Sequence, residues 1–131
     1  MMNPFTFTVN DENKNMVINN IDYLLRSFLT NSSVEYIIFN WVIHMEEIFN
    51  LILQPLSDLE FEVIKITLTC SEEVLKKRIV KDIQLNLREK SSIKGSIERL
   101  ELYKGMSTEK IDTTDISILE TVEKIIKIVK D

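Results

Sequence analysis

Glycine is scarce in this chain, and its scarcity excludes the commonest kind of phosphate-binding loop. The 131 residues include only two glycines, Gly95 and Gly105. Loops that surround a phosphate use several glycines, because their backbone must turn tightly and approach the ligand closely. The motif G-x-x-x-x-G-K-[ST] occurs nowhere in the sequence. A loop of that kind is therefore not encoded in these residues.

Cysteine and excess positive charge are also lacking. The single cysteine, Cys70, excludes an internal disulfide and cannot by itself build a metal site. Sixteen basic residues are spread among twenty-one acidic ones, for a net charge of −5. Proteins that bind nucleic acid or anionic membranes carry concentrated positive charge. We therefore expect neither nucleic acid nor a membrane as a partner, and no metal ligand set.

Long apolar runs are missing as well. The longest uncharged apolar run, Tyr36 to Met45, is half of the roughly twenty residues that a membrane-spanning helix requires. The start, Met1-Met2-Asn3-Pro4, lacks the basic and apolar regions of a secretion signal. We expect a cytoplasmic protein. With 44% hydrophobic residues, the chain has enough apolar side chains for one core, so we expect a single domain over residues 1–131.

The apolar pattern that is present alternates between strands and helices, which predicts an α/β fold. The predicted strands are Phe5–Val9, Tyr36–Val42, Val63–Cys70 and Lys110–Thr113. The runs in the second and third of these are nearly continuous, as in parallel strands that are covered on both faces. The pattern therefore predicts a three-layer fold with a parallel sheet between helices.

Five helices are expected around these strands. The predicted helices follow Asn10, run from Met45 to Leu53, follow Ser71, cover Ser96–Tyr103 and follow Ser117. The first carries an apolar stripe that is predicted to face the sheet, and Pro55 stops the second. Capping side chains support the predicted helices after Ser71 and after Ser117. Glu72 and Glu73 follow Ser71, and Ser117 and Glu120 form a capping box. For the last helix the predicted buried face is Val122, Ile125, Ile126 and Val129.

Three segments in this order resemble the P-loop kinases of small molecules. They are the strand and acid-started helix over Val63–Arg78, the pair Leu87-Arg88 followed by Ser96–Leu100, and Ile111–Thr114 before a capped helix. From about Tyr36 onward, the chain is similar in layout to adenylate-kinase-like, shikimate-kinase-like and nucleoside kinases. The resemblance implies an incomplete P-loop kinase-like fold, with a lid-like segment at about 84–95.

The resemblance also implies ligands and residue roles. ATP and magnesium are the expected cofactors, and the phosphoryl acceptor is a small molecule whose identity the sequence leaves open. Arginines in a lid stabilise the charge on a transferred phosphoryl group. The implied catalytic residues are Arg78 and Arg88, the implied substrate contacts are Asn40, Trp41 and His44, and the implied cofactor contacts are Asp112, Thr113 and Thr114.

Each of these residues also has a purely structural interpretation. Arg78 would then be an exposed partner of Glu73 or Asp82 on its own helix. The residues from Asp112 to Thr114 would be turn and capping residues, while Trp41 and His44 would fill the core. The sequence leaves both interpretations open for every one of them. Asn40 stands where a kinase would have a carboxylate, and an amide cannot act as a base.

Two functions compete on this basis. The first is the C-terminal portion of an ATP-dependent small-molecule or nucleoside kinase-like protein, without catalysis of its own because the phosphate loop is missing. That loss could come from truncation or be natural. The second is a non-enzymatic binding or self-assembly module. Loss of an opening strand would uncover sheet edges, so we expect a homodimer, in which Phe5–Val9 pairs within its own chain or is exchanged.

Overall fold

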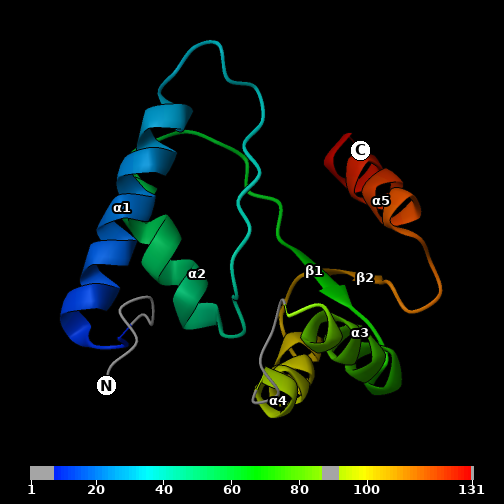
Figure 1. Ribbon diagram of the computed structural model, residues 1–131. Coiled ribbons are helices and arrows are strands. Elements are labelled where there is room, and N and C mark those ends of the chain that lie inside the picture. The colour runs from blue at the N-terminus through cyan, green and yellow to red at the C-terminus, as the bar shows by residue number, and fades with distance from the viewer. Residues whose placement is uncertain (1–7, 87–91, 131) are drawn as a thin grey trace. The chain divides into compact units, whose positions relative to one another are not determined.

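The computed structural model describes residues 8–86 and 92–130, and they form two compact units (Figure 1). Unit 1 contains the residues up to Val42 together with Glu46–Phe61. Unit 2 contains Ile43–Met45 and the residues from Glu62 onward. The prediction of one domain stays a prediction, and each unit is described by itself.

Unit 1 is built from helices. It contains α1 (Asp11–Leu29), α2 (Glu46–Leu53) and the short 3-10 helix η1 (Gln54–Leu56). Asn10 caps α1, since its Oδ1 accepts a hydrogen bond of 2.8 Å from the backbone N–H of Asn13. This confirms the predicted helix start. Pro55 lies in the first turn of η1, where its missing N–H costs no hydrogen bond.

Arg26 connects α1 to the segment that follows α2. The guanidinium of Arg26 donates to both carboxylate oxygens of Asp58, at 2.9 and 3.0 Å, and to the backbone carbonyl of Pro55 at 2.6 Å. The hydrogen bond from Arg26 is the main reason that the pKa of Asp58 lies below its ordinary value. Ile52 and Leu56 are buried in the same unit. The end of α1 is therefore joined to the chain after α2 by apolar and ionic contacts.

Two sequence predictions fail in unit 1. The segment Tyr36–Val42 has no regular secondary structure, and Ile38 is 94% exposed, so the predicted strand is absent there. A strand forms only where a neighbour satisfies its backbone groups, and the described part of this unit offers none. Within its unit α1 packs on α2 and η1, and Leu24 and Phe28 of its predicted apolar stripe are 54% and 48% exposed. In the predicted strand Phe5–Val9, residues 8 and 9 have no strand structure, and residues 5–7 lie outside the described part.

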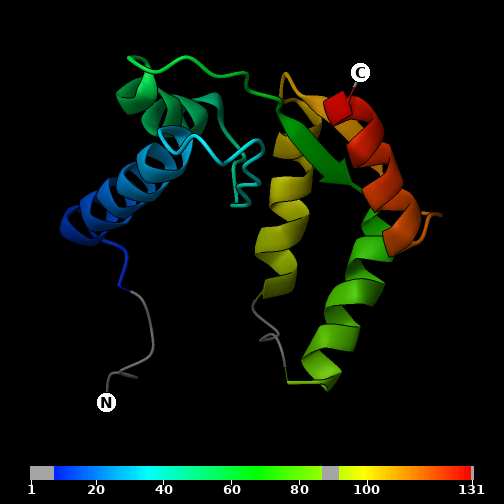
Figure 2. The same cartoon turned by 90° about the horizontal axis from the view of Figure 1, so that it is seen from above.

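Unit 2 contains a parallel pair of strands. Its elements are β1 (Ile66–Thr69), α3 (Glu72–Gln84), α4 (Ser92–Lys104), β2 (Glu109–Asp112) and α5 (Ile118–Lys130). β1 pairs with β2 in parallel, from Ile66 opposite Glu109 to Thr69 opposite Asp112. The predicted parallel pairing is confirmed for these two segments, although β1 is shorter than predicted. Helices occupy the connection between the strands, as parallel pairing requires (Figure 2).

Capping explains where α3 begins and ends. Ser71 accepts a hydrogen bond of 3.2 Å from the backbone N–H of Val74, which confirms the predicted cap. After Gln84 the helix ends through Asn86, whose φ of 59° places it in the left-handed region that asparagine tolerates. α3 packs on α4, and α4 packs on β1, with Ile79, Leu100 and Ile111 buried. Figure 1 shows α5 on the other side of the strands from α3 and α4.

One of the two glycines lies inside a helix, where glycine usually costs stability. A Cβ atom on Gly95 in α4 would lie 3.3 Å from Nη1 of Arg99. Arg99 also donates to the hydroxyl of Ser96 at 3.4 Å. The glycine thus leaves room for a guanidinium that folds back along its own helix. α4 itself begins four residues before the predicted Ser96.

The capping box of α5 is confirmed, and its predicted buried face is partly right, because Ile125 and Val129 are half-buried whereas Val122 and Ile126 are exposed. The backbone N–H of Glu120 donates to the Ser117 hydroxyl at 3.1 Å, and the Glu120 carboxylate accepts from Ser117 N at 3.3 Å. Val122 and Ile126 are 43% and 46% exposed, whereas Thr121 is buried. The side of α5 that packs against the rest of unit 2 therefore does not include Val122 and Ile126. The apolar stripe is wider than the area that this unit covers.

The α/β class with a parallel sheet is established, and the three-layer arrangement stays a prediction. The sheet of the described residues has two strands, in the order β1-β2. None of the helices in this part of the chain is long and apolar enough to cross a membrane.

Burial predicts how unit 2 responds to loss of core volume. Ile79 is 2% exposed on α3, and its neighbour Val80 is 42% exposed. We expect Ile79→Ala to lower the free energy of unfolding by about 2–4 kcal/mol, because it removes contacts and leaves a cavity. The matched change Val80→Ala should cost less than about 1 kcal/mol. Urea denaturation followed by circular dichroism measures both, and equal losses would contradict this assignment of the core.

Candidate functional site

Arg78 and Thr113 meet beyond the carboxyl ends of the two strands. Nη1 of Arg78 donates to the Thr113 hydroxyl at 2.9 Å, and Nη2 donates to the Thr113 carbonyl at 2.7 Å. The Thr113 hydroxyl in turn donates to the backbone carbonyl of Thr69 at 2.9 Å, and Thr113 N donates to the same carbonyl at 2.7 Å. A residue on α3 is thereby fixed to the ends of both β1 and β2.

Thr114 forms a second connection, between the N-terminus of α3 and the end of β2. Its hydroxyl accepts a hydrogen bond of 2.8 Å from the backbone N–H of Ser71 and donates to Oδ1 of Asp112 at 2.6 Å. Thr114 N donates to the same carboxylate oxygen at 2.9 Å. The hydroxyls of Thr113 and Thr114 each act once as donor and once as acceptor, so the loop after β2 has a defined conformation.

Asp112 is held in its ionised form. The hydrogen bonds from the side chain and then the backbone of Thr114 are the main causes that lower its pKa, and the positive charges of Lys124 and Arg78 lower it further. The carboxylate is nevertheless exposed to solvent. Such a group can accept hydrogen bonds from the hydroxyls or amines of a ligand. The neighbouring guanidinium of Arg78, by contrast, binds anions.

We call Ser71, Arg78, Asp112, Thr113 and Thr114 the carboxyl-edge cluster. Its location agrees with the rule that open parallel sheets bind ligands beyond the carboxyl ends of their strands. The structure brings together one implied catalytic residue, Arg78, and all three implied cofactor contacts. Arg78 contacts Thr113, a partner that the interpretation as a surface arginine beside Glu73 or Asp82 did not include. Glu73 pairs with Lys77 at 3.4 Å.

The other predicted site residues do not join this cluster. Asn40 and Trp41 lie in the irregular part of unit 1, where Trp41 and Phe39 make an edge-to-face contact with ring centroids 6.4 Å apart. His44 belongs to unit 2, is partly buried, and its Nδ1 has no hydrogen-bond partner in the described part. Arg88 lies outside the described residues. The roles of these four residues stay predictions.

Two groups that influence the site were not predicted from the sequence. Lys124, on α5, influences Asp112 although twelve residues separate them in the chain. The backbone N–H of Ser71 is a partner of Thr114, whereas the sequence suggested only the capping role of the Ser71 side chain. Helix periodicity could have placed Lys124 on the polar side of α5. Nothing in a sequence pattern shows which backbone group a hydroxyl 43 residues away will meet.

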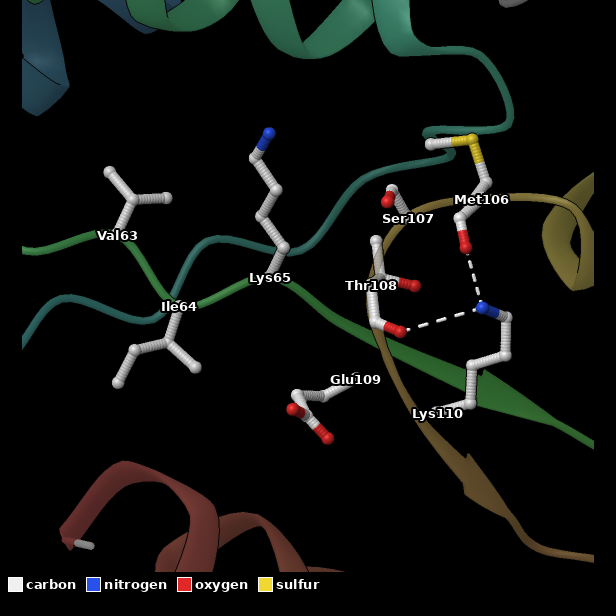
Figure 3. A pocket seen from close by; sticks show the side chains of 8 residues that line it. All are labelled: Val63, Ile64, Lys65, Met106, Ser107, Thr108, Glu109 and Lys110. Atoms are coloured by element: carbon white, nitrogen blue, oxygen red, sulfur yellow. Dashed lines mark hydrogen bonds between the residues drawn. The ribbon is translucent and has the colours of Figure 1, made fainter.

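A shallow depression of about 600 Å³, widely open to solvent, lies at the opposite, amino ends of the strands (Figure 3). It is lined by Val63–Lys65 and by residues 106–110. Lys110, the cation shown with its hydrogen bonds in Figure 3, donates to the backbone carbonyls of Met106 at 2.5 Å and Thr108 at 3.4 Å. These bonds give Lys110 a structural role. The carboxyl-edge cluster, with its exposed carboxylate and guanidinium, is the better candidate site.

No family model, curated protein or solved structure matches this chain. The described residues contain no group of three or more His, Cys, Asp or Glu side chains that could hold a metal ion.

The lowered pKa of Asp112 predicts a pH effect with a definite sign. A carboxyl whose pKa is lower in the folded protein stabilises the fold above the unfolded value of about 3.9, and this contribution is lost as the pH falls through the folded value. In Thr114→Val, which removes the side-chain donor to Asp112, we expect the pKa to rise toward its ordinary value. Acid unfolding should then begin at a higher pH.

Carbon NMR of the Asp112 carboxyl across a pH titration measures this change directly. Thr108→Val is the matched control, because the Thr108 hydroxyl bonds to Thr67 at 2.6 Å, away from Asp112. An unchanged Asp112 titration in Thr114→Val, or an equal shift in Thr108→Val, would contradict the hydrogen-bond origin of the lowered pKa.

Proposed function

We propose that this chain is the C-terminal portion of an ATP-dependent P-loop small-molecule or nucleoside kinase-like protein. In this proposal its carboxyl-edge cluster contacts a nucleotide, and the chain does not catalyse phosphoryl transfer by itself. The observation that carries the proposal is the double hydrogen bond between Arg78 and Thr113. It joins two of the segments that resemble the kinases, at the sheet edge where ligands of such folds bind.

The residues of the cluster fit a nucleotide in part. Arg78 uses one donor on each of Nη1 and Nη2 for Thr113, and a guanidinium has five N–H donors in all. The carboxylate of Asp112 suits an amine or hydroxyl of a base or ribose. For the β- and γ-phosphates, however, the chain has no glycine-rich loop. Bound ATP would therefore be held at one side only.

Magnesium would accompany the nucleotide in this proposal. Mg²⁺ is usually bound through one or two carboxylates together with the phosphates of the substrate, and it keeps several of its waters. Asp112 is the carboxylate of the cluster. Asn40, Trp41 and His44 remain proposed substrate contacts, and Arg88 remains a proposed catalytic arginine. The phosphoryl acceptor would be a small molecule, and the compartment the cytoplasm.

A non-enzymatic binding or self-assembly module is the second candidate. Its support is the amount of apolar surface that unit 2 exposes, including Ile118 at 86% and Leu119 at 67% on α5. Large apolar patches on a protein surface often mark sites of interaction with other proteins. The two candidates differ in a simple measurement: the first expects a nucleotide to perturb the carboxyl-edge cluster, and the second expects association without any nucleotide.

Titration with Mg-ATP tests the first candidate. We expect calorimetry to show weak or undetectable binding, and NMR to show shifts confined to the backbone amides of Ser71, Thr113 and Thr114 at millimolar Mg-ATP. A dissociation constant near 1 μM, about −8 kcal/mol of binding free energy, would contradict the role that we assign to the missing loop. Absence of shifts at the cluster would contradict the site itself.

Replacement of the cationic side chain identifies the contact. We expect Arg78→Met to reduce the nucleotide-induced shifts at least about tenfold, since a charged hydrogen bond contributes about 1.5–3 kcal/mol. The matched control is Lys77→Met, which removes the same charge one residue earlier on α3, where Lys77 pairs with Glu73. Equal weakening by both variants would indicate nonspecific attraction between charges instead of a site.

A further inference from the structure

The two strands of unit 2 have edges of very different character. The outer edge of β2 carries charge at three of its four residues, Glu109, Lys110 and Asp112, whereas Ile66-Thr67-Leu68-Thr69 of β1 has no charge and no proline. Charged residues on an edge strand discourage pairing with further strands, and an uncharged edge rich in β-branched residues favours it. The sheet therefore has one protected edge and one edge suited to pairing.

Hydrogen bonding shows which backbone groups lie along the free edge. Thr69 and Lys65 accept bonds from the β2 side, from Thr113 N and Glu109 N. Because alternate residues of a strand direct their backbone groups to opposite sides, Thr67 also faces β2, while Ile66 and Leu68 face outward. Among the described residues no third strand pairs with these outward groups. Leu68 is 50% exposed beside them.

The sequence around Thr67 is symmetric in polarity. Moving outward from this residue, apolar Ile66 and Leu68 are followed by polar Lys65 and Thr69, and then by apolar Ile64 and Cys70. An antiparallel copy of the same strand, centred on Thr67, would therefore place each apolar residue beside an apolar residue of its partner. The single charged residue, Lys65, would lie opposite Thr69 of the partner, so no like charges would meet.

We propose that β1 pairs with β1 of a second copy, antiparallel and with its two-fold axis at Thr67. Ile66 and Leu68 of each copy would exchange both backbone hydrogen bonds with Leu68 and Ile66 of the other. The result is a four-stranded sheet in the order β2-β1-β1-β2. Both of its outer edges are then the charged edges of β2, so assembly stops at the dimer and does not continue as a fibre. This interface is independent of the nucleotide proposal.

Removal of one outward N–H tests the pairing. Proline is tolerated in an edge strand where its nitrogen faces outward, so Leu68→Pro should keep the β1–β2 ladder and block the second copy. By sedimentation and light scattering across a dilution series without nucleotide, we expect a dimer for the natural sequence and a monomer for Leu68→Pro. Lys110→Pro, on the outer edge of β2 opposite Thr67, is the matched control and should remain dimeric.

A disulfide test does not depend on how well the proline variants fold. At the two-fold axis the two Thr67 Cα atoms would form a non-hydrogen-bonded pair, about 4.5 Å apart, which is within the range for a disulfide. In a Cys70→Ala background, we expect Thr67→Cys to give a covalent dimer on oxidation. Lys110→Cys in the same background is the control on β2 and should stay monomeric.

Several outcomes would overturn the interface. They are a natural sequence that is monomeric at every concentration, a Leu68→Pro variant that folds and still dimerises, and a Thr67→Cys variant that cross-links no better than Lys110→Cys. Dimerisation that is lost in a Phe5→Glu/Phe7→Glu double variant, with no cross-link through Thr67, would also overturn it and would favour exchange of the N-terminal segment.

Discussion

The pairing of β1 with β2 is the interaction on which the structure of unit 2 depends. These strands are 43 residues apart in the chain, and their parallel register brings the end of β1, the start of α3 and the loop after β2 to one place. Parallel pairing requires a long connection, which α3 and α4 supply. A slip of the register by one residue would turn Ile111 out of the core and separate Thr113 from the Thr69 carbonyl.

The polar groups at the carboxyl edge follow from that register. Thr69 offers its carbonyl to both donors of Thr113, which leaves the Thr113 hydroxyl correctly oriented to accept from Arg78. Thr114 connects the capped start of α3 to Asp112 in a similar way. The cluster thus places a cation and a carboxylate beside each other without pairing them directly. An arrangement of this kind suits a ligand that carries both an anionic part and hydrogen-bond donors.

Unit 2 also exposes apolar side chains to solvent. In the described part of the chain its sheet has two strands, where parallel sheets are normally larger and covered on both faces. The exposed Leu68 on β1 and the exposed side chains of α5 are consequences of the same shortage of covering elements. The two sheet edges differ in charge. A further strand would therefore pair with β1, where it would not meet the charged side chains of β2.

Local chemistry accounts for most of the successful sequence predictions. The helix starts at Asn10, Ser71 and Ser117 depend on side chains that bond to backbone groups within three residues, so the sequence contains all the partners. The failures depend on distant partners. Tyr36–Val42 has the composition of a buried strand, but the described residues of its unit place no strand beside it, and α5 buries Thr121 instead of Val122.

The sequence by itself therefore determined the capped starts of three helices, the α/β class and the residue types available for a site. Only the tertiary structure decided that Arg78 bonds to Thr113. The physical reason is that capping and periodicity act over three or four residues, whereas the contacts of the cluster join groups that are 35 to 44 residues apart. Such contacts arise only after the register of the two strands is set.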